Sequence, residues 1–154
     1  MELVDLVAQE AVIDDLKCSS KKQALQELSR IAAKQTGLHE RAIFDVVLER
    51  ERLGSTGVGD GIAIPHGRMA EINQITGLFA RLKEPIEFDA VDGHPVDMVF
   101  LLLAPETAGA DHLKALSRIS RLLRDKRICE KLRGAVGADA LYALIADQSS
   151  KAAA

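Results

Sequence analysis

Aromatic residues and cysteine are scarce in this sequence, and their scarcity narrows the classes of function. The 154 residues include no tryptophan, one tyrosine and two cysteines. Cys18 and Cys129 form neither a CxxC pair nor a metal-type spacing, which excludes a disulfide framework and predicts a cytoplasmic protein. The formal net charge is only −3, and a nearly balanced charge with so few aromatic residues argues against nucleic-acid binding.

Long hydrophobic runs are absent as well. The longest apolar stretch, around residues 99–104, is far shorter than the about 20 residues that cross a bilayer. The acidic start of the chain, without a basic residue in its first fifteen positions, excludes an export signal. Because 47% of the residues are hydrophobic and 28% are charged, we expect one globular domain over residues 1–148 and a disordered tail over residues 149–154.

Helical periodicity marks both ends of the chain. Ser20 and Gln23 form a capping-box pattern, after which apolar residues recur at helical spacing up to Gly37. Further helices are predicted over residues 40–52, from residue 111 onward, over residues 125–133 and over residues 139–147.

The middle of the chain has strand character. Residues 75–82 and 96–104 predict strands, and the second run is apolar enough to be covered on both faces. Residues 85–88 predict a short edge strand before a turn at Asp92-Gly93. Strands enclosed by helical ends indicate one α/β or α+β sandwich domain.

A glycine-rich loop follows the second predicted helix. It is neither a nucleotide P-loop, because no Lys-Ser/Thr pair follows the glycines, nor a dinucleotide fingerprint, because it follows a helix. A flexible surface turn is one interpretation; the other is an anion cradle, in which backbone N–H groups, hydroxyls and Arg50 surround a phosphoryl group. The phosphoryl-binding candidates are Gly54, Ser55, Thr56 and Gly57.

Histidine supplies the candidate reactive group. His66 stands between Pro65, which fixes the backbone, and Gly67, which has no side chain to crowd the ring, so we expect an exposed and oriented imidazole. Such a ring is a nucleophile when one nitrogen is unprotonated and the other is held as N–H. His112, at the start of a helix, is the second candidate. An ordinary surface or core histidine is the alternative at both positions.

Other site chemistries have less support. His39 and His94 lie in turns, and no two histidines have HExxH spacing, so we expect no metal and no cofactor. A serine hydrolase would use Ser55, but the GxSxG elbow is missing. Residues 114–133 carry eight cations against two acids. They form either a solvated helix face or a surface that steers an acidic protein toward His112.

One segment resembles a known family. Residues 50–68, with Gly-Ser-Thr-Gly followed by Ile-Pro-His-Gly, resemble the mannitol/fructose-type IIA domain of the bacterial phosphotransferase system. Three further segments follow in the family's order: residues 85–90, 95–97 and 111–113. Within the family the sequence is most similar to the stand-alone nitrogen-regulatory members, since no IIB or IIC segment is fused to it.

The resemblance implies a fold and a site. It implies a central mixed β-sheet flanked by helices, and a phosphohistidine carrier whose phosphorylated residue is His66. The second active-site histidine would be His112 and the active-site arginine Arg50, with residues 54–57 framing the site. Arg68 stands where relatives carry lysine, and its role stays open.

The resemblance also implies partners. An HPr-type phosphocarrier protein (NPr) would donate the phosphoryl group, and regulatory target proteins would respond to the phosphorylation state. The alternative is a sugar-uptake IIA component that passes phosphate to a IIB domain. Nucleic acid and membrane insertion have no part in either.

Overall fold

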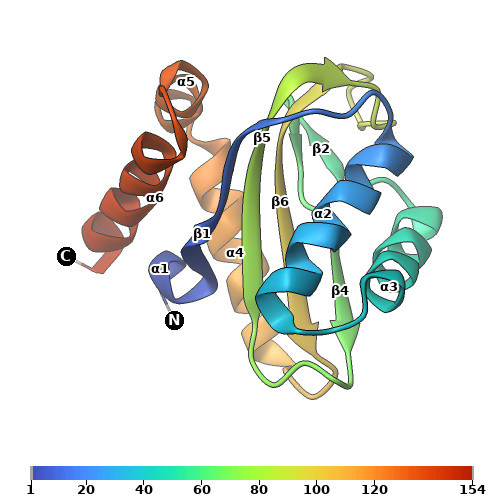
Figure 1. Cartoon of the computed structure of the whole chain (residues 1–154). Coiled ribbons are helices and arrows are strands. Elements are labelled where there is room, and N and C mark those ends of the chain that lie inside the picture. The colour runs from blue at the N-terminus through green and yellow to red at the C-terminus, as the bar shows by residue number, and fades with distance from the viewer. Residues whose placement is uncertain (1, 154) are drawn as a thin grey trace.

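The central strand of the fold is its most apolar segment. β6 (Val96–Pro105) is buried at every position except its second and last, which confirms the predicted strand covered on both faces. β5 (Thr76–Ile86) runs antiparallel beside it, and Phe79 packs edge-to-face on Phe100 with ring centroids 6.4 Å apart. These two strands lie side by side within the sheet (Figure 1), and most of their residues belong to the hydrophobic core.

The computed structural model describes the backbone of residues 2–153 and the side chains of residues 2–148. Its six-stranded sheet has the order β1-β5-β6-β3-β2, and β4 also pairs with β6. The remaining strands are β1 (Val7–Leu16), β2 (Gly57–Gly59), β3 (Ile62–Ala63) and β4 (His66–Met69). Because β3 and β4 run parallel to β6 while β5 runs antiparallel, the expected mixed sheet is confirmed.

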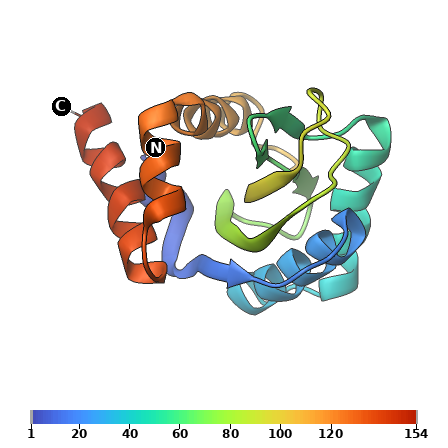
Figure 2. The ribbon, with the colours of Figure 1, turned by 90° about the horizontal axis from the view of Figure 1, so that it is seen from above.

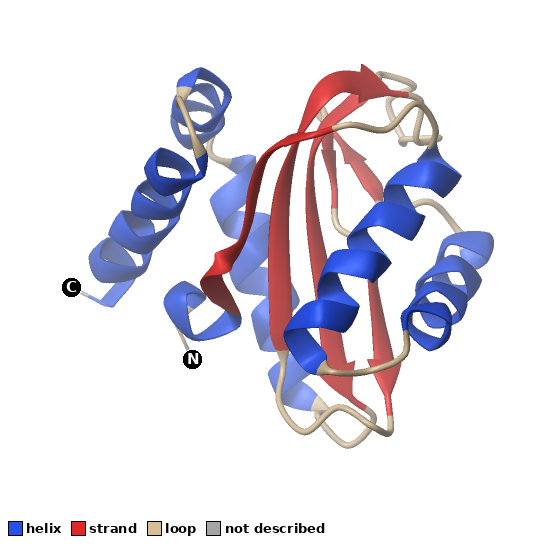
Figure 3. Cartoon of the chain, in the orientation of Figure 1, coloured by secondary structure: helices blue, strands red, loops and turns tan. Residues whose placement is uncertain are grey.

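Helices cover both faces of this sheet. They are α1 (Leu3–Leu6), α2 (Lys21–Thr36), α3 (Glu40–Leu53), α4 (Ala110–Arg124), α5 (Lys126–Gly134) and α6 (Ala138–Ala153). The view from above places α2 and α3 on one side of β5 and β6 and α4 on the other (Figure 2). The α/β sandwich predicted from the sequence is therefore confirmed, with helices outside and strands inside (Figure 3). Among the described residues, none of the helices combines the length and hydropathy of a bilayer-spanning segment.

Local signals set the helix ends. The Ser20 hydroxyl accepts a hydrogen bond from the Gln23 amide at 3.1 Å, and Gly37 ends α2 with a left-handed φ of 76°. Asp125 caps α5 in the same way by accepting from the Arg127 amide at 3.0 Å.

Two expectations about strands need correction. Residues 85–88 do not form a separate edge strand, because Ile86 ends β5, which lies inside the sheet between β1 and β6. β1 does lie at an edge of the sheet, and the sequence did not reveal this strand: its burial does not alternate, and bulges interrupt its pairing with β5. Residues 149–154, the predicted tail, lie outside the described side chains, and their disorder stays a prediction.

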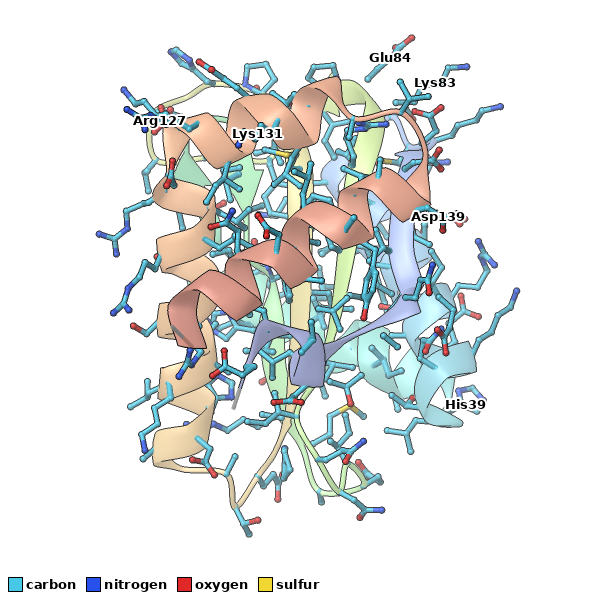
Figure 4. All side chains as sticks on the ribbon, turned by 90° about the vertical axis from the view of Figure 1, so that its left-hand side faces the viewer. His39, Lys83, Glu84, Arg127, Lys131 and Asp139 are labelled. Atoms are coloured by element: carbon cyan, nitrogen blue, oxygen red, sulfur yellow. The ribbon has the colours of Figure 1, made fainter. Side chains whose placement is uncertain are left out.

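The two C-terminal helices, α5 and α6, cover the side of the molecule where β1 lies (Figure 4). Asp139, at the start of α6, accepts a hydrogen bond from the Gln9 side chain on β1 at 3.0 Å. Arg81 of β5 donates to the carbonyl groups of Leu132 and Ala135 at 2.9 and 2.6 Å and so holds the end of α5 against the sheet. The predicted basic run covers α4 and α5, where Arg127 and Lys131 are exposed.

Candidate functional site

His66 begins β4, just after a break between two short strands that both pair with β6. β3 and β4 pair with successive parts of β6, and Pro65 in the gap between them accepts a hydrogen bond from the Leu102 amide at 3.0 Å. The ring of His66 is half-buried, and its Nδ1 lies 2.9 Å from the carbonyl oxygen of Ile64. Since a carbonyl oxygen only accepts, Nδ1 carries the proton and the neutral ring has its free lone pair on Nε2.

His112, on α4, lies beside His66. It lies in the first turn of α4 with 4% of its surface exposed, and its ring packs edge-on to that of His66 with centroids 5.6 Å apart. Its Nδ1 is buried without a hydrogen-bond partner. The two histidines that the sequence singled out are therefore neighbours, although 45 residues of chain (67–111), including strands β5 and β6, lie between them.

Two arginines act on this pair of rings through their positive charge. Arg50, in the last turn of α3, donates from Nη1 to the carbonyl oxygen of Gly54 at 2.8 Å, and its charge acts on His66. Arg68 follows His66 by two residues on β4, so both side chains point to the same face of the strand, and its charge acts on His66 and His112.

These surroundings favour the neutral form of both imidazoles. Burial lowers the pKa of His66 below the ordinary 6.5; the bond to Ile64 opposes the shift, and the charges of Arg50 and Arg68 add to it. Burial also lowers the pKa of His112, with further contributions from Arg68 and His66. A neutral ring is the form that a nucleophilic histidine requires.

The glycine-rich loop is held by bonds of its own. The Ser55 hydroxyl donates to the Phe88 carbonyl oxygen at 2.8 Å and accepts from the Gly57 amide at 3.0 Å. The Thr56 amide donates to the carboxylate of Glu51 at 3.0 Å. The Ser55 hydroxyl and the amides of Thr56 and Gly57 are therefore already hydrogen-bonded, whereas the Thr56 hydroxyl is buried without a partner.

The structure also sorts the remaining candidates. His39 caps α3 by accepting from the Arg41 amide at 3.2 Å, and His94 lies in an exposed turn. Among the described side chains, those of residues 2–148, no three of His, Cys, Asp or Glu gather in a group suited to a metal ion. Glu51 is a buried acid at the site that the sequence analysis did not single out.

Gly67 also contributes to the packing of β4 on α3. A Cβ at this position would collide with a Cγ of Val46 on α3, so the absent side chain allows β4 to pack closely on the helix.

We expect Gly67→Ala to lower the free energy of unfolding by about 1–3 kcal/mol, because overpacking displaces β4 from α3. Urea denaturation measures this loss. Val46→Ala in the same background removes the colliding group and should restore part of the stability. An additive effect of the two substitutions would mean that the close contact is not the cause.

Comparisons with known proteins identify the family of this chain. Residues 5–148 match the family described as phosphoenolpyruvate-dependent sugar phosphotransferase system, EIIA 2. A nitrogen regulatory protein of Bradyrhizobium diazoefficiens is 60% identical over 146 residues, covering 95% of each chain. One from Escherichia coli is 43% identical over 148 residues, covering 96% of this chain and 91% of that protein.

A solved structure is similar as well. Nitrogen regulatory protein IIA-Ntr from Neisseria meningitidis matches with a TM-score of 0.87 at 38% identity, covering 92% of this chain and 97% of that one. The fold, the motif around His66 and these relatives lead to one conclusion. The chain belongs to the EIIA 2 family of the phosphoenolpyruvate-dependent sugar phosphotransferase system.

Proposed function

We propose that the protein is a phosphohistidine carrier of the nitrogen-related phosphotransferase system. It accepts a phosphoryl group on His66 from an HPr-type phosphocarrier protein (NPr) and regulates other proteins according to its phosphorylation state. The observation that carries this proposal is the half-buried His66 ring, tied through Nδ1 to Ile64 at 2.9 Å and packed beside His112 at 5.6 Å. The names of the relatives favour this role over sugar uptake.

Nε2 of His66 is the nucleophile in this proposal. Its lone pair forms the new N–P bond in line with the donor's P–N bond, which breaks and returns its electron pair to the donor imidazole. The proton on Nδ1 stays where it is, since the carbonyl of Ile64 holds it throughout. The bond also fixes the angle of the ring, so that Nε2 is aimed before the donor arrives.

Arg50, Thr56 and His112 act on the phosphoryl group. The Arg50 guanidinium offsets the negative charge of the transferring oxygens, and the Thr56 hydroxyl is a donor with no competing partner. His112 stands at the positive end of α4, which disfavours its protonation but leaves a neutral N–H to donate to an oxygen. No metal or nucleotide is needed for this exchange between two histidines.

The proposal is tested by incubating the purified protein with phosphoenolpyruvate, enzyme I and an HPr-type carrier. We expect acid-labile phosphate on the peptide that contains His66, and no labelling when the carrier is omitted. Phosphate on another residue, or none under conditions that phosphorylate the carrier, would contradict the proposal.

Arg68 should set the pH range of transfer. Because its charge lowers the pKa of His66 and of His112, we expect Arg68→Gln to raise both pKa values. Only the neutral ring is nucleophilic, so transfer in the variant should decline at a higher pH than in the parent protein as the solution is acidified. NMR titration of the ring signals measures the shift. Arg121→Gln, an exposed control on α4, should leave both values unchanged.

A further inference from the structure

We infer that Glu51, through its ion pair with Lys21, is a positioning residue for phosphoryl transfer. It fixes the loop that contains Thr56 and that accepts a hydrogen bond from Arg50. This inference rests on the proposed function. Within the part of the chain that the structure describes, Glu51 makes no hydrogen bond or ion pair with either histidine, so its effect on the chemistry would come through the groups that it holds and through its charge.

The Glu51 carboxylate is a buried charge whose hydrogen bonds and ion pair, among the described residues, go to the loop and to Lys21. Its side chain is only 2% exposed. Both oxygens accept from the Thr56 amide, at 3.0 and 3.1 Å, and Oε1 lies 3.1 Å from Nζ of Lys21. A carboxylate is kept ionised in such a place only when donors surround it, and these contacts provide them.

Lys21 connects the loop to two other parts of the chain. It is the first residue of α2, and its ammonium lies 4.8 Å from the centre of the Phe88 ring and 3.9 Å from the carboxylate of Asp89. The Phe88 carbonyl in turn accepts the hydroxyl of Ser55. The start of α2, the end of α3 and residues 88–89 are therefore tied together around one short loop.

This arrangement places the two groups that would meet the phosphoryl oxygens. Arg50 precedes Glu51 in the chain and donates to Gly54, the first residue of the same loop, at 2.8 Å. The amide that Glu51 holds belongs to Thr56, whose hydroxyl is buried and unpartnered. A shift of the loop would therefore move the guanidinium and the hydroxyl together, and a displacement of about 1 Å can slow a reaction by about 100-fold.

The negative charge of Glu51 also reaches the reacting ring. It raises the pKa of His66, in opposition to Arg50 and Arg68. Loss of the charge should therefore leave an electrostatic trace at His66 that a purely mechanical change in packing does not produce.

Glu51→Gln is the sharpest test, since it keeps the shape of the side chain and removes its charge. The amide has one accepting oxygen and an NH₂ group that would face the Thr56 N–H or the Lys21 ammonium. We expect transfer from a phosphorylated HPr-type carrier to slow by about 10- to 100-fold per folded molecule, and the NMR-measured pKa of His66 to fall. Glu49→Gln, the same change at an exposed position of α3, should alter neither.

Glu51→Asp covers the case in which the neutral variant does not fold. It keeps the charge but shortens the reach by one methylene, so it cannot contact the loop amide and Lys21 together. We expect slower transfer with a smaller change in the pKa of His66. Transfer at the parental rate in a folded Glu51→Gln or Glu51→Asp protein would overturn the inference, whereas failure of the parent protein to accept phosphate on His66 would overturn the proposed function instead.

Discussion

Replacing His66 with alanine should abolish phosphoryl acceptance. The substitution removes Nε2, the only lone pair in the proposal that attacks phosphorus, and no other described group at the site is placed to replace it. His112 is a poor substitute because only 4% of its surface is exposed, which leaves its ring nitrogens little access to a donor protein. Incubation with the phosphorylated HPr-type carrier, followed by quantification of acid-labile phosphate, measures the loss.

The variant should remain folded, which makes the result interpretable. The His66 side chain is half-buried and forms a hydrogen bond with Ile64, so its truncation leaves the core around β6 intact. Far-UV circular dichroism checks the fold. His112→Ala is the matched control: we expect it to accept phosphate more slowly but on the same residue. Normal labelling of a folded His66→Ala protein would remove His66 from its role.

Arg50→Ala should produce the next largest effect, a loss of about 100- to 1,000-fold in transfer rate. The guanidinium is the cation placed to offset charge on the transferring oxygens, and its present bond to Gly54 keeps it at the mouth of the loop. Arg50→Lys keeps the charge but loses the planar fork, so we expect it to recover only part of the rate. Rapid-quench measurement of transfer from the phosphorylated carrier gives these values.

Arg52→Ala separates this effect from a general loss of positive charge. Arg52 lies on the same last turn of α3 and is exposed. We expect it to transfer at nearly the parental rate, with any deficit disappearing as salt is raised. Equal losses in Arg50→Ala and Arg52→Ala would indicate that the arginines attract the donor and do not act on the phosphoryl group.

The parts of the fold that sequence predicts well are those with local signals. The cap at Ser20, the stop at Gly37 and the continuous apolar run of β6 each depend on residues close in the chain, and each is confirmed. β1 escaped prediction because its burial follows from bulges and from its pairing with β5, which its own ten residues do not encode.

The candidate site divides in the same way. His66 is visible in the sequence because Pro65 and Gly67 flank it, and Arg50 because it ends a helix before a glycine-rich loop. Glu51 is not visible, because an acid in an alternating Glu-Arg run is typical of a solvated helix end. Its buried charge is paired with Lys21, a residue of α2 that lies 30 positions earlier in the chain (21 to 51).

The phosphorylated nitrogen of His66 is the most direct test of the proposed chemistry. Long-range ¹H–¹⁵N NMR of the phosphorylated protein distinguishes the two ring nitrogens by their shifts and couplings. We predict phosphate on Nε2, with Nδ1 still protonated and bonded to Ile64. Phosphate on Nδ1, or on His112 in place of His66, would contradict it.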